Sequence, residues 1–178
     1  RFYDLTMRNS AGDTLLSSCE VRNVLNLDTG NIFTRSGYGN DSLWVSNPAI
    51  NAIASTSNYS TSWVNGRLSR SGNVVGSLAT FYLFPVGKTD TLFAPVRLEK
   101  ATVNPAVWTV EYFTGFPFDY LNVFSPPIDH ISRVEYWEMT GVAVADASAK
   151  VSLSWRGYSR VSSNALFRDS LIVAQYIN

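Results

Sequence analysis

The sequence predicts an all-β protein in which a short parallel β-solenoid, or β-helix, precedes an antiparallel, jelly-roll-like β-sandwich. Three observations predict this fold class. Short apolar runs recur about every 20 residues near the N-terminus, runs of alternating apolar and polar residues follow after residue 62, and helical periodicity is weak throughout. We therefore divide the chain into solenoid-like rungs over residues 1–62 and a sandwich domain over residues 63–178.

The rungs are predicted from a weak internal repeat. Residues 5–9 are echoed by residues 25–27 and then by residues 43–47, at spacings of 20 and 18 residues. Each rung of a solenoid buries its inward side chains only against its neighbours, so about three rungs are needed for stability. Because this stretch holds about that number, we expect it to continue a longer solenoid or to pack on the next domain. An ordinary antiparallel meander is the alternative.

Strands at sandwich-like spacing are expected in the second region. They span residues 78–84, 92–98, 107–113, 131–139, 151–155 and 171–177. The first two form a hairpin, in which Pro85 fixes one φ angle and Gly87 supplies freedom at the turn. Asn65 and Gly66 are a good tight-turn dipeptide, and residues 142–150 are the best, though weak, helix candidate.

Composition excludes several classes of partner. The 14 basic and 14 acidic residues give a formal net charge of zero without a basic stripe, so we expect no nucleic-acid partner. No run of about 18 apolar residues occurs, so we expect no membrane-spanning helix.

Cys19 is the only cysteine, which rules out an internal disulfide and predicts a small buried side chain. The chain opens on Arg1 without a visible signal peptide and ends in strand-like residues, so we expect a processed chain or a fragment truncated at its C-terminus.

A series of motifs runs through most of the chain in a fixed order. It comprises residues 2–12 and 24–32, then WVNGRLSR at 63–70, FPVGK at 84–88, YWEMTG at 136–141, VSLSW at 151–155 and DSLIVAQY at 169–176. In this order the motifs resemble modular, adhesin-like domains of secreted cell-surface proteins of the Bacteroidetes, which are mostly exported by type IX secretion. A further tryptophan-containing element that usually follows in such domains is missing here. The resemblance implies a non-catalytic building block of adhesins, of surface filaments that serve gliding motility, or of spacers in secreted enzymes.

The residues give little support to an enzyme. His130 is the only histidine, and no G-x-S-x-G turn exposes a nucleophile. Glu135 and Glu138 lie on opposite faces of one strand because their spacing is odd, and a turn-rich segment separates Glu111 from Asp119. No D-x-D-x-D-G calcium loop occurs. We therefore expect no catalytic residue, no cofactor and no metal site, although calcium bound by loop oxygens stays open.

Aromatic residues supply one candidate ligand or partner site. Any of the five tryptophans would stack on a sugar ring if it were exposed, but most tryptophans in a small β domain belong to the core. The exception is an expected loop over residues 112–120, which carries several rings around Gly115 and Pro117, where a surface loop is normally polar. Its rings are Tyr112, Phe113, Phe116, Phe118 and Tyr120. Alternatively, this loop plugs the end of the sandwich or meets a neighbouring domain.

A short motif, Asp-(Ser/Thr)-Leu, occurs four times. It begins at Asp13, Asp41, Asp90 and Asp169. The motif matches the O-glycosylation acceptor of the Bacteroidetes, so the resemblance implies O-linked glycans on Thr14, Ser42, Thr91 and Ser170. Turn chemistry is a compatible alternative, in which Asp and Ser/Thr end a loop and Leu opens the next strand.

These observations favour a non-enzymatic structural or adhesive module of a large secreted, cell-surface or filament-forming bacterial protein. Its expected partners are neighbouring domains, copies of the same protein and surface polysaccharide. The alternative is a carbohydrate-binding module that accompanies a secreted enzyme, which predicts an exposed aromatic platform. A hydrolase, the third hypothesis, predicts a cleft where at least two ionisable groups converge.

Overall fold

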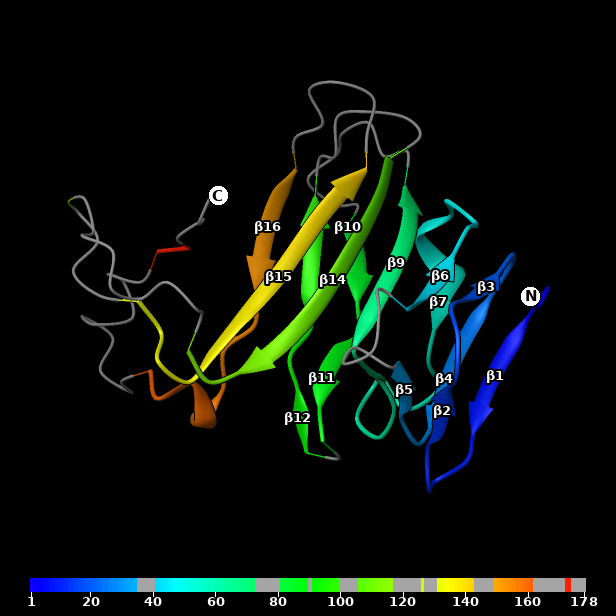
Figure 1. Ribbon diagram of the computed structural model, residues 1–178, viewed down its shortest axis with the longest axis horizontal. Coiled ribbons are helices and arrows are strands. Elements are labelled where there is room, and N and C mark those ends of the chain that lie inside the picture. The colour runs from blue at the N-terminus through cyan, green and yellow to red at the C-terminus, as the bar shows by residue number, and fades with distance from the viewer. Residues whose placement is uncertain are drawn as a thin grey trace.

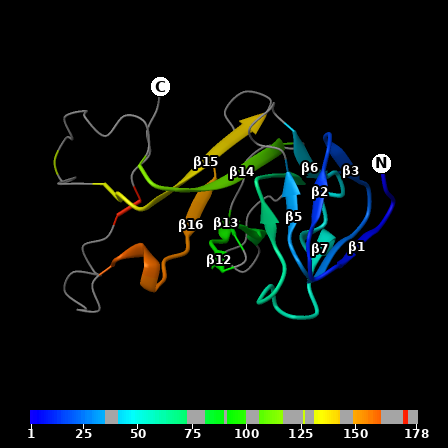
Figure 2. The ribbon, with the colours of Figure 1, turned by 60° about the horizontal axis from the view of Figure 1, so that its bottom comes forward.

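The computed structural model describes residues 1–34, 41–72, 81–89, 91–99, 106–116, 126, 131–142, 149–161 and 172–173. The all-β prediction is confirmed: the described strands form four sheets, and the only helices among the described residues are two short 3-10 turns, η1 (Ile50–Ala52) and η2 (Gly157–Ser159). The first strand triplet comprises β1 (Leu5–Arg8), β2 (Asp13–Leu15) and β3 (Cys19–Val21). It lies at the opposite side of the described part of the molecule from β15 (Glu135–Val142) and β16 (Lys150–Leu153) (Figure 1, Figure 2).

Successive strands among the first nine belong to three different sheets in turn. One sheet contains β1 (Leu5–Arg8), β4 (Leu25–Thr29) and β7 (Ile53–Ala54). A second receives β2 (Asp13–Leu15), β5 (Ile32–Thr34) and β8 (Val64–Asn65), and a third receives β3 (Cys19–Val21), β6 (Ser42–Val45) and β9 (Arg67–Gly72). All the pairings among these nine strands are parallel. The short apolar runs of the sequence thus become strands stacked one on another.

The register confirms one repeat spacing and corrects the other. Leu5 lies opposite Leu25, as the spacing of 20 residues predicts. Leu25 in turn lies opposite Ile53, whereas Leu43 belongs to the third sheet and pairs with Cys19. The spacing of 18 residues therefore relates two strands that belong to different sheets. The division of the chain at residue 62 stays a prediction, and the β5–β8 and β6–β9 ladders join residues on its two sides.

The later strands pair mainly antiparallel. A fourth sheet contains β10 (Phe81–Phe84), β13 (Val96–Glu99) and β16 (Lys150–Leu153). The second sheet gains β11 (Val86–Lys88) and β12 (Leu92–Phe93), and the third gains β14 (Ala106–Thr114) and β15 (Glu135–Val142). The strands expected over 107–113 and 151–155 are confirmed with small shifts at their ends. The strand expected from 131 begins only at Glu135, because Ser132 Oγ accepts hydrogen bonds from the backbone of Val134 and Glu135 in a preceding turn. The strand expected over 171–177 and the helix candidate over 142–150 fall largely outside the described residues.

The antiparallel pairing across Pro85 is confirmed for β10 and β13, but the strand expected over 92–98 divides into β12 and β13, which belong to different sheets. Gly87 also has a different role from the expected one. Phe84 pairs with Val96 across β10 and β13, and Pro85 marks the point where the strand passes from the fourth sheet to the second. Gly87 lies inside β11 rather than in a turn. A Cβ atom there would lie 2.2 Å from the carbonyl oxygen of Leu92 and 2.7 Å from Nε1 of Trp63. Close packing, rather than a turn conformation, requires glycine at this position.

The core lies between the sheets and is built from alternate strand residues. Leu25, Leu43, Leu68, Val96 and Val110 all have essentially no exposed surface. Cys19 is free and only partly buried, at the edge of this core.

Candidate functional site

The most prominent candidate surface is the outer face of the third sheet. We call this sheet, with the strand order β15-β14-β9-β6-β3, the front sheet, because it faces the viewer in Figure 1. Leu43, Leu68 and Val110 point into the core, so the residues next to them in sequence point outward. The outer face therefore carries mostly hydroxyl and charged side chains.

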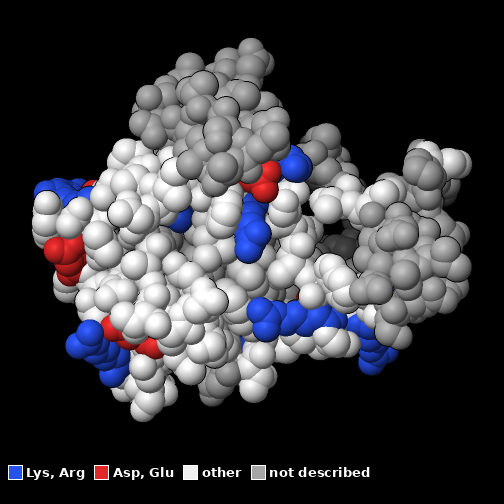
Figure 3. Space-filling model, turned by 180° about the vertical axis from the view of Figure 1, so that it is seen from behind, with Lys and Arg blue, Asp and Glu red and all other residues white. Residues whose placement is uncertain are grey.

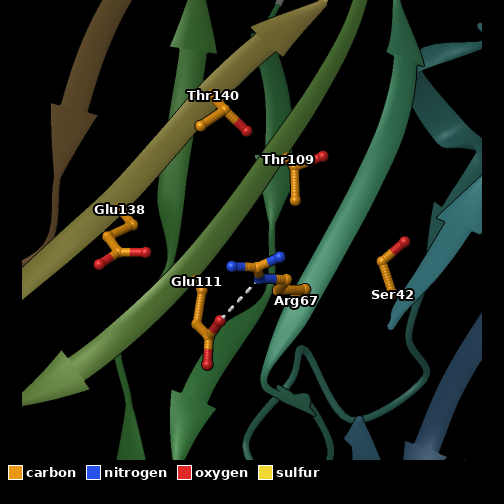
Figure 4. Close-up of a pocket in the computed structure, with 6 residues that line it drawn as sticks. All are labelled: Ser42, Arg67, Thr109, Glu111, Glu138 and Thr140. Atoms are coloured by element: carbon orange, nitrogen blue, oxygen red, sulfur yellow. Dashed lines mark hydrogen bonds and ion pairs between the residues drawn. The ribbon is translucent and has the colours of Figure 1, made fainter. Parts of the chain in front are cut away.

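Two adjoining hollows lie on this face. The first has a volume of about 370 Å³ and is lined by Ser42, Arg67, Thr109, Glu111, Glu138 and Thr140 (Figure 4). The second, of about 440 Å³, reaches from Ser18 and Trp44 on one side to Val107 and Val142 on the other. Ser42 lines both hollows, so they form one continuous surface that runs across all five strands.

A charge cluster lies at the base of the first hollow. Glu111 is only 2% exposed, and its carboxylate lies 3.3 Å from Nε of Arg67 and 3.2 Å from Nζ of Lys88. Lys88 also lies 5.0 Å above the ring of Phe113, which stacks on Tyr136 with a centroid distance of 4.9 Å. A buried carboxylate is costly unless paired, so these two cations hold Glu111 in place. The opposite face of the molecule is mostly uncharged where it is described (Figure 3).

The structure brings together two carboxylates that the sequence reasoning did not pair. Glu111 lies directly opposite Glu138 in the β14–β15 ladder. Glu138 is exposed and forms no ion pair with a described cation, whereas Glu135 is buried and accepts a hydrogen bond from Tyr112. Only the register of the two strands reveals the Glu111–Glu138 pair, and no motif in the sequence fixes that register. His130 lies outside the described residues, and no group of three His, Cys, Asp or Glu side chains that could hold a metal ion occurs within the described ranges.

The predicted aromatic loop is corrected in part. Tyr112 and Phe113 belong to β14 and therefore point to opposite faces of the front sheet. Tyr112 is buried and its hydroxyl donates to Glu135 at 2.9 Å; burial, together with Glu135, raises the pKa of Tyr112 well above its usual value. Phe116 is 44% exposed, with the Arg133 guanidinium 5.9 Å from its ring. Phe118 and Tyr120 lie outside the described residues.

The tryptophans divide between core and surface. Trp63 is only 3% exposed, whereas Trp155 is 49% exposed. Trp108 and Trp137 are partly buried against the core. Trp44 is partly buried on the outer face of the front sheet, and it is the only one of the five that lines either hollow among the described residues.

The four predicted glycosylation acceptors lie in different surroundings. Thr14 is exposed in β2, and Thr91 is exposed in the turn between β11 and β12. Ser42 is partly buried at the start of β6 and lines both hollows. Ser170 lies outside the described residues. Turn chemistry therefore explains the motif at Thr91 but not at Thr14 or Ser42, which belong to strands; glycosylation stays a prediction.

A second candidate surface is the edge of the first strand triplet. β1 and β2 are the outermost strands of their sheets, and each has one side without a partner strand among the described residues. β3 is also outermost, but Phe2 pairs with Val21 along part of it. Three large apolar side chains of this triplet are exposed: Phe2 by 46%, Tyr3 by 70% and Leu16 by 72%.

None of the helices among the described residues has the length and apolar character that crossing a membrane requires. Comparisons of this chain with protein-family models, with curated proteins and with solved structures find no match.

Proposed function

We propose that this chain is a non-enzymatic structural and adhesive module of a large secreted, cell-surface or filament-forming bacterial protein. In its finer architecture, the first nine strands would form a short β-solenoid, and the antiparallel strands would form a jelly-roll-like sandwich built on it. The proposal follows the motif resemblance, and one structural observation supports it above others. That observation is the open edge of the parallel sheets, where β1 and β2 each have one side without a partner strand among the described residues.

An open strand edge is a site for strand addition. Its free N–H and C=O groups pair readily with another strand, and proteins that avoid this place Lys or Pro on the edge. The segment from Arg1 to Arg22 contains neither Lys nor Pro. Tyr3 and Leu16 are exposed beside these edges, and a neighbour that pairs there would bury part of their apolar surface away from water. A neighbouring domain or a second copy of the chain would thus extend the sheets end to end.

Proline substitution on the outward side of the edge tests this role. Leu5 N–H donates to the Val24 carbonyl and Asp13 N–H donates to the Asn31 carbonyl, so the N–H groups of Thr6 and Thr14 point away from the neighbouring strands. Thr6→Pro and Thr14→Pro should therefore remove only outward donors. Sedimentation velocity over a range of concentrations should show association of the wild-type protein that both variants weaken. Thr6→Val, which keeps the N–H group, is the matched control and should associate like the wild type.

Two results would count against this role. One is a wild-type protein that stays monomeric at every concentration, and the other is undiminished association of proline variants whose circular dichroism is native. The proposed location is tested separately, because brief protease treatment of intact source cells should release peptides of this chain if it is displayed on the surface.

A further inference from the structure

We propose that the outer face of the front sheet binds a neutral polysaccharide chain that lies across the strands. This binding site goes beyond the scaffold role, since it uses the face of the sheet rather than the edges of β1 and β2. The site is the continuous surface formed by the two hollows, which Figure 4 shows in part.

Ladder register aligns the outward side chains in rows that cross the sheet. One row joins five residues that lie opposite one another in successive strands: Glu20, Trp44, Ser69, Thr109 and Thr140. Neighbouring strands are about 4.8 Å apart, so this row is roughly 19 Å long, enough for several sugar rings. A neighbouring row carries Ser42 and Arg67, followed by the facing pair Glu111 and Glu138.

The chemistry of these rows suits sugar hydroxyl groups. Hydroxyl side chains both donate and accept hydrogen bonds, carboxylates accept them, and a guanidinium donates them. Ser69 is only 5% exposed, and its hydroxyl oxygen lies 2.7 Å from that of Thr109, so this contact orients the partly exposed Thr109 hydroxyl. A polymer with many hydroxyl groups along its length offers matching partners across the whole row.

Trp44 supplies a flat apolar surface within the same row. Its Nε1–H donates to the hydroxyl of Ser71 at 3.1 Å, so the indole is held across the neighbouring strand β9. Val107 and Val142 line the same hollow, and Val142 is 74% exposed. An indole held in this way stacks on the apolar face of a sugar ring with little loss of side-chain entropy.

The charges favour a neutral polymer over an acidic one. Arg67 and Lys88 are both engaged by the buried Glu111. Glu138 lies exposed beside them and forms no ion pair with a described cation. A carboxylate at this position repels an acidic polysaccharide but accepts charge-assisted hydrogen bonds from neutral sugars.

Affinity electrophoresis of the full chain tests the site directly. Native gels would contain a soluble neutral polysaccharide, with β-glucan, xylan and galactomannan tested in turn, or alginate as the acidic polymer. We expect at least one neutral polymer to retard the protein and alginate to leave it unretarded. Trp44→Ala should weaken binding at least about tenfold and Glu138→Ala about three- to tenfold, whereas Trp44→Phe should retain most of it. Asn51→Ala, at an exposed position of η1 outside both hollows, is the control and should bind like the wild type.

Three outcomes would contradict the proposed binding site. These outcomes are no retardation by any of the neutral polymers, retardation by alginate alone, and unchanged binding by a natively folded Trp44→Ala variant. Thr6→Pro, which tests the scaffold role, should leave retardation unchanged. The two roles therefore fail independently.

Discussion

Arg70 is a fully buried cation that donates hydrogen bonds to backbone carbonyls. Its guanidinium donates to the carbonyl oxygens of Leu83, Ala49 and Ile50 at 2.7 to 3.1 Å, and lies 4.9 Å from the centroid of the Tyr82 ring. Burial lowers the pKa of Arg70 to about 10, so the side chain is still charged at neutral pH. It thereby ties β9 to β10 and to the segment that contains η1.

Replacement of Arg70 tests whether these contacts outweigh the cost of burying the charge. Arg70→Met keeps much of the apolar volume but removes the guanidinium donor from three carbonyl groups, of which that of Ala49 also accepts a hydrogen bond from the Ala52 N–H. It should therefore lower the free energy of unfolding by about 2–4 kcal/mol. Urea denaturation measures this difference. A Met variant as stable as the wild type would show that the charge is tolerated rather than stabilising.

Gly30 occupies a position where both backbone conformation and space exclude a side chain. Its φ angle is +82°, and a Cβ atom would lie in direct overlap with the carbonyl oxygen of Asn9. Gly30→Ala should therefore destabilise the protein by at least about 2 kcal/mol in urea denaturation.

Two other glycines separate the causes of this effect. Gly115 has a φ angle of +103° but no atom within 4 Å of a built Cβ, so Gly115→Ala should cost about 1 kcal/mol from backbone strain alone. Gly157, which has neither feature, should accept Ala within about 0.5 kcal/mol. Equal effects at all three positions would contradict the steric argument.

At the scale of an element, one aspartate organises the polar segment between β7 and β8. Asp28 in β4 receives hydrogen bonds from Arg8 and Thr56, each at 2.9 Å, and its backbone carbonyl receives two more from Ser57 and Thr61. The segment has the composition of a linker, but these bonds hold it against β4. The contact with Arg8, followed by the bond from Thr56, lowers the pKa of Asp28 below its usual value.

This pKa shift predicts an acid-sensitive contribution to stability. The folded-state pKa of Asp28 is lower than its unfolded value of about 3.9. The contribution is therefore complete above that value and is lost as the pH falls through the lower, folded pKa. Unfolding free energies measured between pH 2 and pH 7 should fall in acid more steeply for the wild type than for Asp28→Asn. A curve for Asp28→Asn identical to that of the wild type would contradict this account.

At the scale of the whole molecule, strand pairing joins the two regions that the sequence divides at residue 62. β5 pairs with β8, β6 with β9, and β8 with β11, so ladders run continuously from the first region into the second. Leu43 and Leu68, from opposite sides of the division, lie opposite each other in the core. Removal of either region would expose buried strand edges and apolar side chains.

Expression of residues 1–62 alone tests this dependence. We expect the fragment to lack stable structure by circular dichroism and to gain none at low temperature, while the full chain unfolds in one transition. A folded fragment with its own unfolding transition would contradict this prediction and support an independent first domain.

The sequence predicted elements better than it predicted their partners. Its alternating apolar residues identified the strands around Val107–Phe113 and the hairpin through Pro85, because the period of burial in a strand is local. It counted Tyr112 and Phe113 in the aromatic loop, although both fall within the strand predicted over 107–113, and the structure places them in β14. It also compared Leu43 with Leu25, which belongs to a different sheet, because pairing depends on which distant strand lies alongside. The Glu111–Glu138 pair and the row through Trp44 were missed for the same reason.

By itself, then, the sequence determined that the chain forms short strands, where several of them lie, and that charges are few and balanced. Those properties follow from the side chains and their spacing along the backbone. Only the tertiary structure decided which side chains share a face: that Trp44 aligns with Thr140 across five strands, and that Glu111 lies between Arg67 and Lys88. Register decides this because a shift by a single residue moves every side chain of a strand to the opposite face.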